Sequence, residues 1–278
     1  MAKLDLIDSV AHPYKEVNED LFDHNDQAAW IFDGASGIGP KIMTHAPSDP
    51  YWLVHTFNDA LKKNWNDATP TKQLFEKASA AIAEEFLRQA PVVPPAVDRP
   101  TACLLMARLG RNRLEVSAVG DCWLVYRSGT NVQEFGNKLG DVAAPVYREL
   151  KRLKETGVSG KDLVDRLIPV EREVRAKANT DGGYAILDLT ARWINRMAEH
   201  VFDARAGDEF LLMTDGFYRL IDIFKAYTAA SLIEAARNKG LAALYTELRE
   251  MEAGDEDCAL YPRIKIRDDA AAALLKVS

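Results

Sequence analysis

The stretch AAWIFDGASG at residues 28–37 sets an apolar run directly before an Asp-Gly pair. Residues 28–32 are apolar throughout, which predicts a buried strand, and Asp33-Gly34 predicts the turn that ends it. The same order returns at residues 208–214 (DEFLLMT), another apolar run that leads into Asp215-Gly216. Two strands that end on the same dipeptide indicate that acidic residues lie at strand ends in this chain.

The rest of the chain alternates groups of strands with pairs of helices. Short breaks at 110–112 and 120–121 separate three apolar runs, which predicts an antiparallel meander. Helix pairs between groups of strands favour an α+β fold of packed layers over a parallel α/β sheet. We predict strands at 4–10, 28–32, 101–108, 113–119, 122–127, 208–214 and 258–266, and helices at 50–64, 71–89, 216–225, 228–238 and 240–251.

Composition restricts the class of protein. The 278 residues include 35 Lys and Arg against 42 Asp and Glu, a net charge of −7, which argues against a nucleic-acid-binding surface. No run approaches the ~18 apolar residues that a membrane helix needs. The three cysteines are odd in number and lack CxxC spacing, which favours a reduced compartment. We expect a soluble, cytoplasmic protein without a nucleic-acid or membrane partner.

Acidic residues recur where an apolar run meets a loop. Carboxylates that converge from several strand ends repel one another, so they ionise together only beside a compensating cation. Mg²⁺ and Mn²⁺ prefer such oxygen ligands, and two ions together can activate water for attack on phosphorus. Each pair alone is also consistent with a simple turn, and Asp215 with a helix N-cap. The positions are Glu19-Asp20, Asp33-Gly34, Asp121, Asp215-Gly216 and Asp255.

Six short motifs in order carry a resemblance to a known family. They resemble the metal-dependent serine/threonine protein phosphatases of type 2C (PPM-type) from about residue 5 to 267. The resemblance implies a four-layer α/β/β/α sandwich of two antiparallel sheets flanked by helices, as one domain over 1–278 with a variable helical flap at about 137–200. The motifs are NED (18–20), IFDGASG (31–37), PTA (100–102), VGDCWLVY (119–126), LLMTDGF (211–217) and DEDCAL (255–260).

The resemblance also implies a binuclear Mg²⁺ or Mn²⁺ site. Asp33 would bridge the two ions, with Glu19 and the carbonyl oxygen of Gly34 on one of them. Asp215 and Asp255 would hold the other ion, although Asp257 offers a second register for the last ligand.

Three more residues receive roles from the same resemblance. Asp121 matches the position that joins a third, weaker metal site in some members. Asp20 would hydrogen-bond metal-bound water, and Lys15 would bind the substrate phosphate in place of the family's common arginine. Lysine keeps the charge but lacks the bidentate fork of a guanidinium. Ala35 stands where some members have a proposed general-acid histidine, and PTA replaces the usual GSTA.

We therefore predict a metal-dependent phosphatase that hydrolyses phosphoserine or phosphothreonine on proteins through a metal-bridging water. Two alternatives stay open at the level of sequence. One is a divergent, weakly active or inactive relative that acts as a binding or regulatory protein, which the departures at Lys15 and Ala35 motivate. The other is a phosphatase for a small phosphorylated metabolite. The segment 137–200 either sets specificity or only shields the sheet edge.

Overall fold

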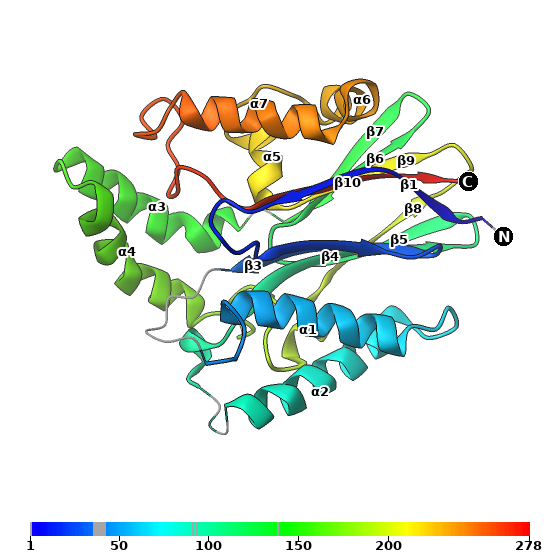
Figure 1. The fold of residues 1–278 in the computed structure, drawn as a ribbon, viewed down its shortest axis with the longest axis horizontal. Helices are drawn as coiled ribbons and strands as arrows, with labels where there is room; N and C mark the ends of the chain where they lie inside the picture. Colours follow the sequence, from blue (N-terminus) through cyan, green and yellow to red (C-terminus); the bar gives the residue numbers. More distant parts are fainter. Residues whose placement is uncertain (1, 36–42, 91, 93, 138) are drawn as a thin grey trace.

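The structure is a computed structural model that describes residues 2–35, 43–90, 92, 94–137 and 139–278. Two five-stranded antiparallel sheets pack face to face (Figure 1). The first sheet has the order β1-β10-β9-β6-β7 and the second β2-β3-β4-β5-β8. Their strands are β1 (Leu4–His12), β2 (Asp20–His24), β3 (Ala28–Ala35), β4 (Thr101–Gly110), β5 (Arg113–Val119), β6 (Trp123–Ser128), β7 (Asn131–Gly136), β8 (Ala198–Asp203), β9 (Glu209–Met213) and β10 (Ala270–Val277).

Helices cover the outer face of each sheet and one end of the sandwich (Figure 1). The second sheet is covered by α1 (Asp49–Asn64) and α2 (Thr71–Gln89). The first sheet is covered by α5 (Asp215–Asp222), α6 (Ala229–Lys239) and α7 (Leu241–Ala253). A further pair, α3 (Gly140–Glu155) and α4 (Gly160–Arg175), projects at the end of the sandwich. Within the described residues, every helix is too short or too polar to traverse a lipid bilayer.

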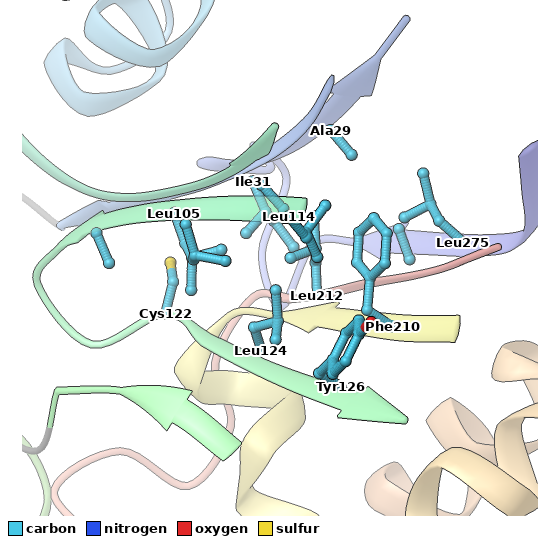
Figure 2. Packing of buried hydrophobic residues seen from close by; sticks show 14 of the residues in the cluster. Ala29, Ile31, Leu105, Leu114, Cys122, Leu124, Tyr126, Phe210, Leu212 and Leu275 are labelled. Atoms are coloured by element: carbon cyan, nitrogen blue, oxygen red, sulfur yellow. The ribbon is translucent and has the colours of Figure 1, made fainter. Parts of the chain in front are cut away.

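Three apolar layers hold the sandwich together. Side chains of both sheets interdigitate in the central layer, among them Ile31, Leu105 and Leu212 (Figure 2). Phe57 of α1 and Phe75 of α2 are fully buried against the second sheet. The helices α5–α7 bury a comparable leucine-rich layer on the first sheet. Burial of apolar area on this scale is the main favourable term for a chain of this length. The four-layer α+β architecture expected from the sequence is confirmed.

The predicted strand at 258–266 is wrong. These residues form an irregular loop, and the last strand is β10, which pairs with β1 and β9. Its sequence, AAAALLKV, has no β-branched residue before Val277, so local propensity conceals the strand. Residues 270–275 are buried in the middle of the first sheet, where tertiary packing overrides propensity. A second difference lies at Asp20, which begins β2 and does not sit in a loop.

The segment 137–200 divides into two parts in the structure. Helices α3 and α4 pack mainly on each other through Leu150, Leu153 and Leu167. The remainder belongs to the body of the sandwich, because Leu187 and Trp193 are buried in the layer under α1 and α2. The helical projection is therefore shorter than the expected insertion, and residues 198–203 form the edge strand β8.

Candidate metal centre

A pocket of about 510 Å³ opens at one edge of the sandwich, beside β2, β3 and the start of β10. Its walls come from three regions that are far apart in the sequence: residues 14–20, the end of β3 with the start of α1, and the loop before β10. Most of the polar residues in it are acidic. The lining residues are Tyr14, Lys15, Glu16, Val17, Glu19, Asp20, Asp33, Gly34, Ser48, Lys265, Asp268 and Asp269.

Strand register brings Asp33 and Asp20 together. They are paired residues on the neighbouring strands β2 and β3. Paired residues on antiparallel strands point to the same side of the sheet, so two carboxyl groups meet there. Thr214 at the end of β9 adds a third segment, because its Oγ1 donates to Asp20 Oδ2 at 2.8 Å. Thr214 is fully buried and also bonds the backbone of Ala271, which fixes Asp20 relative to the first sheet.

Asp215 follows Thr214 as the first residue of α5. Its charge acts on the carboxyl group of Asp33, and the charge of Asp268 acts on Asp215 in turn. The N-cap position belongs to Thr214, so Asp215 is free to face the other acidic residues. The expectation that strand ends bring Asp33 and Asp215 together is met by the geometry.

Both Asp-Gly pairs are close approaches of two chain segments. A Cβ atom at Gly34 would lie 2.7 Å from the carbonyl oxygen of Glu19. At Gly216 a Cβ would lie only 1.9 Å from the carbonyl oxygen of Asp269. Neither contact is tolerable for a side chain, so glycine is required by the neighbouring segment. The two pairs do more than make turns, since each glycine lets another acidic segment reach its aspartate.

Asp255 does not join this group. Its Oδ2 accepts from Arg263 Nη1 at 2.5 Å, and its Oδ1 accepts from the backbone amides of Ala259 and Leu260, both at 2.9 Å. It is buried within its own loop. Burial alone would raise its pKa, but the amides of Leu260 and Tyr261 and the guanidinium of Arg263 outweigh that effect and lower the pKa to about 2. Asp257 accepts from the amide of Ala259 in the same loop. Asp255 and Asp257, the two residues that the sequence offered as the last metal ligand, are therefore engaged within their own loop.

Asp268 lies where Asp255 was expected. Its charge acts on Asp33 and Asp215, and it lines the pocket directly before β10. Arg219 Nη2 of α5 donates to its Oδ2 at 3.0 Å, and Arg249 Nη2 of α7 donates to its backbone oxygen at 2.6 Å. In the sequence, Asp268 belongs to an acidic pair before an apolar run, but a run that begins with alanines does not predict a strand.

The second acid of that pair, Asp269, ties two loops together. Its Oδ1 accepts from the amide of Tyr14 and its Oδ2 from the amide of Glu19, both at 2.7 Å. The side chain of Glu19 in turn accepts from Ser48 Oγ at 2.5 Å. Lys15 therefore lies in a segment that is held against the start of β10, and it lines the pocket.

Asp121 extends the acidic group toward β4. Ligand atoms of Asp33, Cys103 and Asp121 all lie within 4.8 Å of one another. Cys103 is paired with Asp33 across β3 and β4, and its Sγ donates to Asp121 Oδ1 at 3.0 Å. Cys103 was not predicted as part of the site, although it stands two residues after Thr101 in the PTA motif. Its thiol keeps a pKa well above the usual value because it is buried beside these carboxylates.

We call Asp20, Asp33, Asp121, Asp215 and Asp268 the carboxylate cluster. Burial is the largest influence on the first four, and the neighbouring acids add to it. The pKa of Asp121 rises to about 7, and those of Asp20, Asp33 and Asp215 are also raised. Hard divalent ions fit this donor set, because it offers several buried carboxylate oxygens whose mutual repulsion a cation would remove.

Ala35, the position of the missing histidine, contacts the helical projection. Its carbonyl oxygen accepts from Arg175 Nη2 of α4 at 3.3 Å, and the same nitrogen donates to Thr101 Oγ1 at 2.8 Å. Arg175 is buried, and nothing in its local sequence distinguishes it from the other arginines of this charged segment. The contact links α4 to the end of β3, two residues after Asp33.

The fold is that of the type 2C serine/threonine phosphatases. The catalytic domain of the phosphatase PstP, solved with two manganese ions, is similar over 100% of this chain and 99% of that chain (16% identity, TM-score 0.57). PppA from Pseudomonas aeruginosa covers 100% and 98% (14%, 0.56), and the photosystem II phosphatase PBCP covers 100% and 99% (13%, 0.58). No protein-family model matches the chain, and no curated protein matches it by sequence.

Proposed function

We propose that this protein is a metal-dependent phosphatase that hydrolyses phosphoserine or phosphothreonine on proteins. The observation that carries the proposal is the carboxylate cluster, which is assembled from five segments and of which Asp20, Asp33 and Asp268 line an open pocket. The similarity to PstP supports it, since that structure holds two manganese ions in the same fold.

In this proposal five residues would hold two metal ions. Asp33 would bridge two Mg²⁺ or Mn²⁺ ions, with Glu19 and the carbonyl oxygen of Gly34 toward one and Asp215 and Asp268 toward the other. Bound ions of this kind supply a water nucleophile at neutral pH and neutralise charge that develops on phosphorus.

Three further residues act around the ions. Asp20, held by Thr214, would accept a hydrogen bond from a water molecule in the pocket and so orient that water. Asp121 would join a third, weaker site. Lys15 would bind an oxygen of the substrate phosphate through its ammonium group.

A protein substrate is favoured by the surroundings of the pocket. Lys265 lines the pocket, and the same loop carries apolar side chains that face solvent. Leu260 is 75% exposed, Ile266 41% and Tyr261 37%. Exposed apolar side chains on a loop that also lines the pocket suit a peptide better than a small polar ester.

The test is hydrolysis of p-nitrophenyl phosphate with Mn²⁺, with a chelator, and by Asp33→Asn and Asp215→Asn. We expect turnover that the chelator abolishes and that both variants lose by at least a thousandfold. Asp162→Asn is the matched control, because Asp162 is an exposed acid of α4 paired only with Arg166 in the contacts described. Near-normal turnover by Asp33→Asn would refute the proposal.

A second assay separates the substrates. We expect phosphothreonine peptides to be hydrolysed with a higher kcat/KM than small phosphorylated metabolites. The reverse order would favour a metabolite phosphatase. Metal binding by calorimetry without turnover of any ester would instead favour a binding or regulatory protein.

A further inference from the structure

Lys265 enters the pocket from the loop that joins α7 to β10. Its Nζ lies 3.0 Å from Asp268 Oδ1, and it lines the pocket with Lys15. Figure 1 shows this loop descending from α7 past α3 before it enters β10. Of the pocket-lining residues described, these two lysines carry the positive charge.

The partner of Lys265 is held in a fixed place. Asp268 Oδ2 is bonded to Arg219 Nη2, and Arg219 Nη1 donates to Glu252 Oε1, both at 3.0 Å. Arg249 contacts the same glutamate and also the backbone oxygen of Asp268. Glu252 is fully buried, so the chain of charges runs from the core of α7 to the pocket wall. An ammonium bound to such an anchor has a defined position at the wall.

The ammonium of Lys265 keeps donors for a ligand. Lysine has three N–H donors, and the contact with Asp268 uses one of them. The side chain is 45% exposed, so the remaining donors can reach a molecule in the pocket. A lone lysine gives one point of charge, whereas a phosphate group offers several oxygens.

The two lysines come from segments that Asp269 holds together. Asp269 binds the amides of Tyr14 and Glu19 on either side of Lys15, and it follows Lys265 by four residues. A phosphate dianion entering this acidic pocket is repelled by its carboxylates unless cations meet its oxygens.

We propose that Lys265 is a second phosphate-binding residue, which together with Lys15 holds the phosphate of the substrate in this pocket. The proposal rests on the proposed function and deepens it. Two lysines on two anchored segments supply the two-point contact that one lysine lacks.

The test is the binding of inorganic phosphate to the Mn²⁺-loaded protein by calorimetry, for the wild type, Lys265→Met and Lys265→Arg. We expect Lys265→Met to raise the Kd for phosphate about tenfold, as loss of one charge-assisted hydrogen bond does. The KM for p-nitrophenyl phosphate rises by a similar factor, while kcat stays within about twofold. Lys265→Arg restores most of the binding.

Lys62→Met is the matched control. Lys62 has a similar ion pair, with its Nζ 2.7 Å from Asp23 Oδ2, and its side chain is 54% exposed, but it lies outside the pocket lining. We expect its phosphate Kd and KM to equal those of the wild type. Equal losses in Lys62→Met and Lys265→Met would mean a general charge effect and would overturn the proposal.

The outcomes separate this inference from the proposed function. Unchanged phosphate Kd and KM in Lys265→Met would overturn the role of Lys265 while turnover by the wild type upholds the phosphatase. A change in Mn²⁺ affinity alone, with phosphate binding intact at saturating Mn²⁺, would also overturn it. Phosphate binding that depends on Lys265 in a protein without turnover would retain the lysine's role and refute the phosphatase. A wild type that neither binds phosphate nor turns over would refute both.

Discussion

Arg263 and Asp255 form a salt bridge of 2.5 Å in which each side chain is 2% exposed. The pair explains why an acidic residue in a promising position is not part of the carboxylate cluster. Its role is to close the loop between α7 and β10, whose later residues carry Lys265, Asp268 and Asp269 into the pocket. Asp255 thus holds the loop together, and Asp268 lines the pocket.

Asp255→Asn should therefore act on stability and not on metal affinity. It leaves the buried charge of Arg263 without a counter-charge, which costs about 3 kcal/mol in free energy of unfolding. Denaturant unfolding measures this, and Mn²⁺ calorimetry should give an affinity within about twofold of the wild type. Asp257→Asn, at the exposed neighbour, is the control and should change neither quantity.

Asp268→Asn should show the opposite pattern. Loss of one carboxylate lowers Mn²⁺ affinity at least tenfold. The metal-free protein should lose less stability than in Asp255→Asn, because Arg219 keeps its ion pair with Glu252 and repulsion within the cluster falls. Calorimetry and thermal unfolding of the metal-free protein test both parts. Intact Mn²⁺ affinity in Asp268→Asn, with a loss of affinity in Asp255→Asn, would show that Asp255 is the metal ligand, as the sequence predicted.

The stability of the metal-free protein should fall as pH rises through the range of the cluster. Asp121 has a pKa of about 7 in the folded state against an ordinary 3.8, so between about pH 4 and 7 the folded chain holds a proton that the unfolded chain has released. Stability from this group is complete below about pH 4 and is lost as pH rises through 7. Thermal unfolding between pH 5 and 8 tests this, and Asp121→Asn should flatten the slope. Mn²⁺ should raise Tm more at pH 8 than at pH 6, because binding displaces protons.

Gly216→Ala should disrupt the metal centre through the backbone. The added Cβ would lie 1.9 Å from the carbonyl oxygen of Asp269, so α5 and the start of β10 must separate. We expect a loss of about 1–3 kcal/mol in free energy of unfolding, together with weaker Mn²⁺ binding. Gly254→Ala is the control, since its nearest neighbour atom would be 3.4 Å away. Unaltered Mn²⁺ binding in Gly216→Ala would show that metal binding does not need the close approach of Asp269 to Gly216.

Arg175→Met tests whether α4 supports the site. It removes the donors to Ala35 and Thr101, which frees the end of β3 beyond Asp33. We expect kcat/KM for p-nitrophenyl phosphate to fall about tenfold. Arg172→Met is the control on the same helix, because Arg172 pairs with Asp98 at 2.5 Å. Equal effects of the two variants would indicate that α4 acts only as a shield.

The sequence by itself determined the layers of the fold and most of the cluster. Apolar runs of strand length, separated by turn residues and helix pairs, predict antiparallel strands in packed α+β layers, because burial of those runs needs such layers. The resemblance of the short motifs to the type 2C phosphatases implied the sandwich of two sheets. The Asp-Gly pairs at the ends of β3 and β9 located Asp33 and Asp215 for the same local reason. Glu19 and Asp20 followed from their place where an apolar run meets a loop, and Lys15 followed from the resemblance to the type 2C phosphatases.

Only the tertiary structure decided which acid completes the cluster. The choice between Asp255 and Asp268 depends on Arg263, which lies within the last loop and pairs with Asp255, and on Arg219, which reaches Asp268 from α5. The strand after Asp268 is built largely from alanine, so its strand character comes from burial between β1 and β9 and not from its own preference. Nothing in the sequence distinguishes Lys265 and Arg175 from the other lysines and arginines. Arg175 contacts Ala35 across 140 positions of the chain, and Lys265 shares its pocket with Lys15 across about 250 positions, which no local pattern records.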